Sequence, residues 1–72
     1  MSSLAKMTAG DRGIVSEIRS TAARVDKLAA LGILPGVELL VHQKKPVFVV
    51  EADETVLALE HELAEGIVVA KL

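Results

Sequence analysis

The sequence predicts a mainly β fold: a small, partly open barrel of five strands, with one helix between the first two strands and a short helical turn before the last. Two observations support this fold. Short segments rich in Val, Ile and Leu are separated by Gly, Pro and Asp, which is typical of strands joined by tight turns. Only one stretch carries apolar residues at the spacing of a sustained helix.

The composition limits both the size of the protein and its kinds of function. A chain of 72 residues has the length of one small domain, which we expect to span residues 1–72. No cysteine is present and Phe48 is the only aromatic residue, so disulfides, thiolate metal sites and base-stacking surfaces are excluded. The net charge of −2, with both signs mixed along the chain, argues against nucleic-acid binding.

The first strand is predicted at Gly13–Arg19, after a frayed N-terminus at Met1–Ser3. Its β-branched residues favour a strand, but regular alternation would put Val15 and Ile18 on opposite faces of the sheet. One extra residue in a strand shifts the alternation of the side chains that follow it. We therefore predict a bulge near Ser16–Glu17, which brings both apolar side chains inward.

The helix is predicted at Thr21–Leu31, with Ser20 as its N-cap because a serine hydroxyl can accept from a free N–H of the first turn. Val25 and Leu28 lie on its apolar stripe and are expected to close one end of the barrel. Gly32 ends the helix, since a residue without a Cβ adopts the left-handed conformation of a helix stop at the least cost.

A turn and four further strands complete the predicted fold. Pro35 and Gly36 suit the central positions of a type II turn, because Pro fixes the first φ and Gly accepts the positive φ of the second. Leu34 is held extended by the proline and is expected to be exposed. The later elements are strands at Val37–Gln43, Val47–Glu51, Thr55–Leu59 and Ile67–Ala70, and a helical turn at Glu60–Ala64.

Three side chains are candidate metal ligands: His42, His61 and Glu65. Imidazole and carboxylate together suit a ferrous or zinc ion. However, two histidines without a short fixed spacing do not define a site, and the i, i+4 spacing of His61 and Glu65 needs a helix longer than one turn. We therefore expect no metal centre and no cofactor, with weak binding of a divalent ion such as Fe²⁺ at these side chains as the alternative.

The chain shows no motif of a catalytic site, and we expect a protein that is not an enzyme. It lacks the Gly-x-x-x-x-Gly-Lys-Ser/Thr loop that binds nucleotide phosphates. No serine has a partner base that the sequence reveals. The carboxylates of the second half fall at loops and strand ends, where they are expected to be solvated. These carboxylates are Glu51, Asp53, Glu54, Glu60, Glu62 and Glu65.

Surface for protein contact therefore remains as the functional feature. Arg24 and Lys27 on the outer face of the helix, with Leu34 beyond it, are the first residues expected to contact a partner. Lys44 and Lys45 at the tip of a hairpin could steer the protein toward an acidic partner.

Two further interpretations concern the second and third strands. Leu40 and Phe48 fall off the cleanest inward faces and could meet as a cross-strand pair, which either forms a docking patch or closes a second small core. The strand Val47–Glu51 could be an exposed sheet edge. Pairing of such an edge across a two-fold axis would give a homodimer.

Several motifs along the chain occur in a characteristic order. Leu31–Gly36 is a helix end followed by a Gly-hydrophobic-x-Pro-Gly turn, and the chain closes with Ala-x-x-Ile-x-Val at residues 64–69. With the earlier glycines, this order resembles the FeoA family, ferrous iron transport protein A, from Leu4 to Val69. Lys27 stands where that family usually has Arg, so a planar bidentate contact is not preserved there. The other matching residues are Gly10, Gly13, Val15, Ile18, Leu28, Leu57 and Leu59.

The resemblance implies an SH3-like barrel and a small cytosolic accessory of ferrous iron uptake. The implied partner is the membrane transporter FeoB, on its cytosolic side. The chain itself is not expected to enter the membrane, because its apolar runs fall short of the roughly 20 residues that a spanning helix needs. The same domain type is fused to metal-dependent repressors of the DtxR kind. The alternative function is therefore a metal-responsive regulatory domain that binds a divalent ion itself.

Overall fold

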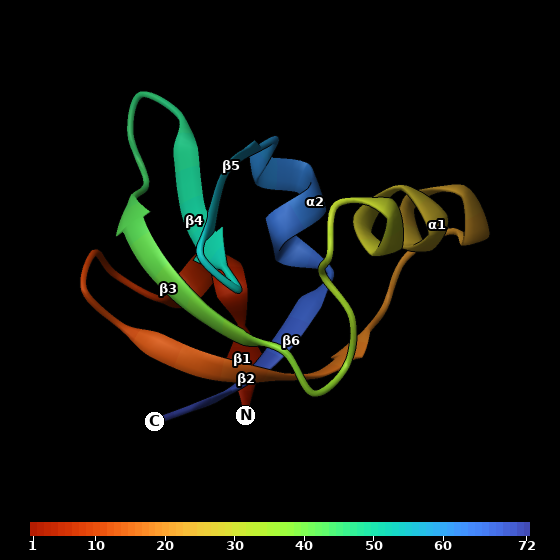
Figure 1. Ribbon diagram of the computed structural model, residues 1–72, viewed down its shortest axis with the longest axis horizontal. Coiled ribbons are helices and arrows are strands. Elements are labelled where there is room, and N and C mark those ends of the chain that lie inside the picture. The colour runs from red at the N-terminus through yellow and green to blue at the C-terminus, as the bar shows by residue number, and fades with distance from the viewer.

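The computed structural model describes all residues from 1 to 72 and contains one antiparallel sheet with six strands. Its strand order is β1-β6-β2-β3-β4-β5, and the long strands β2 and β3 curve together beneath the β4–β5 hairpin and α2 (Figure 1). No helix is long and apolar enough to cross a membrane. The strands are β1 (Ser2–Ser3), β2 (Arg12–Ile18), β3 (Glu38–Gln43), β4 (Phe48–Ala52), β5 (Thr55–Leu59) and β6 (Ile67–Lys71). The helices are the 3₁₀ turn η1 (Leu4–Lys6), α1 (Ala22–Ala30) and α2 (His61–Glu65).

The N-terminus is not frayed as predicted but forms the sixth strand. Ser2 and Ser3 pair with Val69 and Val68 of β6. Ser3 also fixes the next element, since its Oγ accepts from the backbone N–H of Ala5 at 3.1 Å and so caps η1. The same hydroxyl donates to the carbonyl of residue 65 at 2.9 Å. These contacts direct the apolar side chains of the N-terminal segment into the core.

The predicted bulge in the first strand is confirmed. The register between β2 and β6 shifts between Val15 and Glu17. Because of this shift, Val15 is buried and Ile18 also packs against the core. The imperfect alternation of the sequence therefore reports a real irregularity of the sheet.

Helix α1 begins and ends one residue inside the predicted range, and its N-cap is Thr21 rather than Ser20. The Thr21 Oγ1 accepts from the backbone N–H of Arg24 at 3.3 Å. Ser and Thr both cap helices well, and the two occur side by side here, so the sequence alone did not distinguish between them.

The predicted stop at Gly32 is confirmed. Gly32 has a φ of +90°, its N–H donates to the Ala29 carbonyl at 3.0 Å, and the N–H of Ile33 donates to the Leu28 carbonyl at 2.9 Å. These two bonds define a Schellman motif. Leu28 and Ile33 are both fully buried, so the helix end is attached to the core by an apolar contact as well as by hydrogen bonds.

Only one of the two residues expected to close the barrel reaches its core. Leu28 is fully buried in the main cluster, whereas Val25 is half-buried and is not among the side chains that pack against that cluster. Helix α1 lies to one side of the sheet in Figure 1, which explains why a single leucine anchors it.

The Pro-Gly turn also forms as predicted. The N–H of Val37 donates to the Leu34 carbonyl at 3.1 Å, and Gly36 has a φ of +94°. This positive φ at the third turn residue defines a type II turn. The chain then enters β3 at Glu38.

Two predictions about the hairpins are wrong. Strand β4 lies between β3 and β5, so the edge of the sheet is β5 and not the segment predicted at Val47–Glu51. Leu40 is opposite Glu51, and the partner of Phe48 is Leu59, so the expected Leu40–Phe48 pair does not form. Strand order depends on long-range pairing, which local patterns do not specify.

The core is one apolar cluster between the curved sheet, η1 and α2. Helix α2 replaces the predicted helical turn and begins after Glu60, whose side chain makes no capping hydrogen bond. The Lys45–Pro46 peptide bond in the β3–β4 hairpin is cis. The cluster contains Leu4, Met7, Val15, Leu28, Ile33, Leu39, Val41, Phe48, Val50, Ala52, Leu59, Ala64, Ile67 and Val69.

Candidate protein-interaction surface

Two of the predicted contact residues face α2. Arg24 pairs with Glu62, and the Lys27 Nζ lies 3.6 Å from the Glu60 Oε1. All four side chains are substantially exposed, so each pair contributes little to stability, up to about 1 kcal/mol. The two pairs connect α1 to α2, so the outer side of α1 carries less free positive charge than the sequence suggested.

Leu34 is exposed as predicted, and it lies in a groove with a second exposed leucine. The exposed fractions of Leu34 and Leu31 are 45% and 38%. Val37 and Ala52 complete its apolar lining, and the acidic residues Glu38 and Asp53 also line it. We call this feature the apolar groove. It separates the end of α1 and the Pro-Gly turn from the β4–β5 hairpin.

Leu31 was not singled out from the sequence as a surface residue. It follows Leu28 at helical spacing, so its position is compatible with the buried stripe. In the structure it is the C-cap of α1, where the chain turns away, and its side chain is left outside. The feature of the sequence that could have indicated its exposure is its position directly before Gly32, where the helix stops.

Lys44 and Lys45 lie apart from the apolar groove. They belong to the β3–β4 hairpin, and Lys44 lines a second hollow with Pro46 and Val47 near the C-terminal end of β5. The apolar groove touches the opposite end of β5, at Thr55. The structure therefore does not join the hairpin lysines and Leu34 in one surface.

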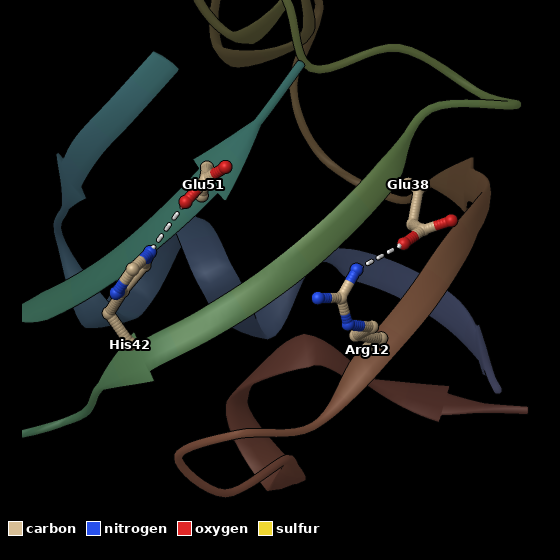
Figure 2. Close-up of polar contacts among 4 residues, drawn as sticks. All are labelled: Arg12, Glu38, His42 and Glu51. Atoms are coloured by element: carbon tan, nitrogen blue, oxygen red, sulfur yellow. Dashed lines mark hydrogen bonds and ion pairs between the residues drawn. The ribbon is translucent and has the colours of Figure 1, made fainter. Parts of the chain in front are cut away.

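The histidines make separate contacts on different elements. On the outer face of the sheet, the His42 Nε2 lies 2.9 Å from the Glu51 Oε1 of β4. A second cross-strand pair lies toward the other end of β3, where the Arg12 Nη1 donates to the Glu38 Oε2 at 3.1 Å (Figure 2). The His61 ring contacts Phe48 edge-on, with centroids 5.7 Å apart.

The three candidate metal ligands do not converge. His42 lies on β3, whereas His61 and Glu65 are the first and last residues of α2. No group of three or more His, Asp or Glu side chains is arranged to hold a metal ion. Helix α2 does supply the i, i+4 spacing that a two-ligand contact needs, but no third ligand joins it.

Two ionisable groups have perturbed pKa values, and both lie away from the apolar groove. The Thr8 backbone N–H donates to the Asp11 carboxylate at 2.9 Å and lowers the pKa of Asp11 below its usual value of 3.8. The Glu17 carboxylate accepts from Arg19 and raises the pKa of that guanidinium. Both groups fix local turns and strand ends.

The fold and this surface define a class of protein: a small SH3-like barrel with an apolar groove on its surface. Solved structures that share the fold include two FeoA proteins and a metal-dependent repressor. An iron uptake regulatory protein (FeoA) is 28% identical, with 99% of this chain and 96% of that chain covered and a TM-score of 0.92. The zinc complex of Stenotrophomonas maltophilia FeoA, described as an SH3 domain protein, is 23% identical, with 97% and 91% covered and a TM-score of 0.82. A manganese-dependent transcriptional repressor is 26% identical, with 99% and 41% covered and a TM-score of 0.90.

The FeoA domain model matches residues 2–71, so the chain belongs to the FeoA family. No curated protein matches the sequence. The family is associated with ferrous iron transport, and its small SH3-like fold is the one predicted from the motif order. The resemblance is therefore confirmed in both family and fold.

Proposed function

We propose that the chain is a non-catalytic accessory of ferrous iron uptake that binds the cytosolic part of the FeoB transporter through the apolar groove. The observation that carries this proposal is the exposure of Leu31 and Leu34, which line one groove. Neighbouring exposed leucines with a carboxylate rim have the composition of a docking site. Membership of the FeoA family supports the choice of partner.

Binding at this groove would regulate the transporter by shifting its conformational populations. It can do so only to the extent that the groove binds one state of FeoB more tightly than another. The barrel contributes a preformed surface, so little ordering entropy is lost on its side of the interface. No step of this mechanism requires chemistry by the chain itself.

The test is titration of the purified cytosolic part of FeoB from the same cell with the intact chain and with Leu34→Ser. Removing a buried apolar anchor from an interface should weaken binding by about tenfold or more. The matched control is Val47→Ser, which changes an apolar side chain of the same exposed fraction, 45%, in the β3–β4 hairpin and outside the apolar groove. Equal weakening by both variants, or no binding by the unmodified chain, would contradict the proposal.

A second candidate function is a metal-responsive regulatory domain. The likeness to a manganese-dependent repressor supports it, although this chain spans only 41% of that protein. Anaerobic titration with Fe²⁺ or Mn²⁺ tests this candidate directly. A micromolar site that is lost on His42→Ala or His61→Ala would favour it over docking alone.

A further inference from the structure

The free edge of strand β5 is unprotected. This strand pairs only with β4, and its sequence Thr-Val-Leu-Ala-Leu contains no charge, no proline and no bulge. Sheet edges usually carry at least one of these features, because an exposed edge can pair with another chain. The opposite edge, β1, is only two residues long and offers little to pair with.

The hairpin geometry determines which backbone groups point outward. Asp53 and Glu54 both have positive φ, so they form a two-residue type I′ turn. The flanking pair, Ala52 and Thr55, is then the hydrogen-bonded pair, and alternate residues of β5 bond to β4. The N–H and C=O groups of Val56 and Ala58 face away from the sheet.

These outward groups have no other partner in the protein. No turn, loop or side-chain hydrogen bond involves any residue of β5. Val56 is 57% exposed and Ala58 is also exposed, so the edge is open on its outer face. Two donors and two acceptors are therefore presented at the spacing of a β-strand.

The two ends of this edge differ in charge. The segment Pro46–Ala70 contains six carboxylates and no lysine or arginine. Asp53 and Glu54 at one end of β5 make no ion pair, whereas Glu60 at the other end pairs with Lys27 at 3.6 Å and lines a hollow together with Lys44. An occupant with basic residues at the end that meets Asp53 and Glu54 would complement this pattern.

A second copy of the chain complements the edge poorly. Antiparallel pairing of the whole of β5 with its own copy centres on Leu57 and brings Glu54 near Glu60 of the copy, at both ends of the ladder. In this register the ends carry like charges, which destabilise a strand pair. A strand with the opposite charge at its end therefore fits the edge better than a second copy does.

We propose that the β5 edge binds an extended segment of another protein as an added strand, with alternating β-branched residues at its centre and Lys or Arg at the end that meets Asp53 and Glu54. Backbone bonds to Val56 and Ala58 would supply affinity, and the flanking charges would fix the register. The inference goes beyond the proposed docking on FeoB, since it concerns a different surface and holds whichever protein supplies the segment.

The first test uses the peptide acetyl-Lys-Lys-Val-Thr-Val-Thr-Val-Lys-Lys-amide and amide hydrogen exchange measured by NMR. In the free protein the amides of Val56 and Ala58 should exchange quickly, and the peptide should slow both. The same peptide with Glu in place of every Lys should bind at least about tenfold more weakly, because one of its ends then meets Asp53 and Glu54 with like charge. Absence of protection, or protection confined to another surface, would overturn the proposal.

The second test changes the edge itself. Ala58→Pro removes an outward N–H that β4 does not use, and edge strands tolerate proline at such positions. Peptide binding should fall about tenfold, since one hydrogen bond and its neighbours are lost, while the thermal midpoint stays close to that of the unmodified chain. Ala58→Val keeps the N–H and should bind normally.

A third variant does not depend on backbone tolerance. Glu54→Gln should weaken the Lys-flanked peptide several-fold and leave the Glu-flanked peptide no weaker than before. Equal binding of all variants would contradict the proposed edge. Protection of Val56 and Ala58 that rises with protein concentration, without peptide, would identify a second copy as the occupant and overturn the proposal.

Discussion

The sheet and helix α1 differ in how many buried side chains hold them in the fold. The sheet surrounds a cluster of 14 buried residues, and each of its long strands contributes to it. Helix α1 contributes one fully buried side chain, Leu28, although it is nine residues long. A helix of this length is not stable in water on its own, so its position depends on a few specific contacts.

Those contacts lie at the two ends and one side of α1. Thr21 caps its start, the Schellman motif at Gly32 fixes its end, and two exposed ion pairs connect it to α2. The comparison shows that α1 depends on fewer buried contacts than the sheet does. The apolar groove lies between the two, so its width depends on how firmly α1 is held.

The largest expected effect comes from removing one buried leucine in each region and comparing how the protein unfolds. Leu39→Ala in β3 and Leu28→Ala in α1 both remove a fully buried leucine, and each should cost about 2–5 kcal/mol if the whole protein responds. We expect Leu39→Ala to reach this range in denaturant unfolding. Leu28→Ala should instead release α1 locally, so that amide exchange rises in residues 22–30 while sheet amides stay protected.

An equal rise of exchange over sheet and helix in Leu28→Ala would show that α1 and the barrel unfold together. The difference between the regions would then be one of packing only.

A smaller effect is expected where two backbones approach closely. A Cβ at Gly66 would lie 2.6 Å from the Arg19 carbonyl oxygen, which is backbone and cannot rotate away. Gly66→Ala should therefore push α2 and β6 from the end of β2 and cost about 1–3 kcal/mol. Thermal melts measure the loss of stability. Gly10→Ala is not a suitable control, because Gly10 has a positive φ and an alanine would be strained there.

The sequence specified local features better than it specified pairing. The Gly32 stop, the Pro-Gly turn and the β2 bulge each depend on residues within a few positions, and all three are confirmed. Strand β1 was missed because two serines carry no strand signal and are ordered by β6. The edge position of β5 depends on the order of all six strands.

The same limit applied to the candidate surface. The exposure of Leu34 followed from its place before Pro35 in a turn, which is local. The pairing of Arg24 and Lys27 with α2 could not be predicted, because it depends on how two distant helices come together. Leu31 was missed because its spacing fits the buried stripe, and only the geometry of the helix end turns it outward.

The helix end itself gives the next effect. Gly32 has open space around it, so a substitution there meets strain from its positive φ and no steric contact. Gly32→Val should cost about 1–2 kcal/mol, since a β-branched residue is strained in the left-handed region. Gly32→Asn, which tolerates this conformation better, should recover much of the loss. An unchanged thermal midpoint in Gly32→Val would mean that the stop does not hold α1.

The ion pairs between the helices should contribute less. A double-mutant cycle of Arg24→Ala and Glu62→Ala should give a coupling of about 0.2–1 kcal/mol that falls at high salt. The Arg12–Glu38 pair, equally exposed but within the sheet, is the matched control. If removal of the Arg24–Glu62 pair also raises amide exchange in α1, these charges help to set the width of the apolar groove.

The smallest effect concerns the scaffold and acts through pH. The pKa of Asp11 is lowered in the folded protein, mainly by the N–H of Thr8, so the charged carboxylate stabilises the turn before β2. This contribution is complete above the ordinary pKa of 3.8 and is lost as the pH falls through the lower folded value. NMR titration should show Thr8 amide exchange rising over that range in the unmodified chain and no such step in Asp11→Asn. The turn leads into β2, and Asp11 pairs with Lys71 of β6, so the effect belongs to the sheet. Amides of α1 should not respond in either protein. A response there would show that the two regions are coupled.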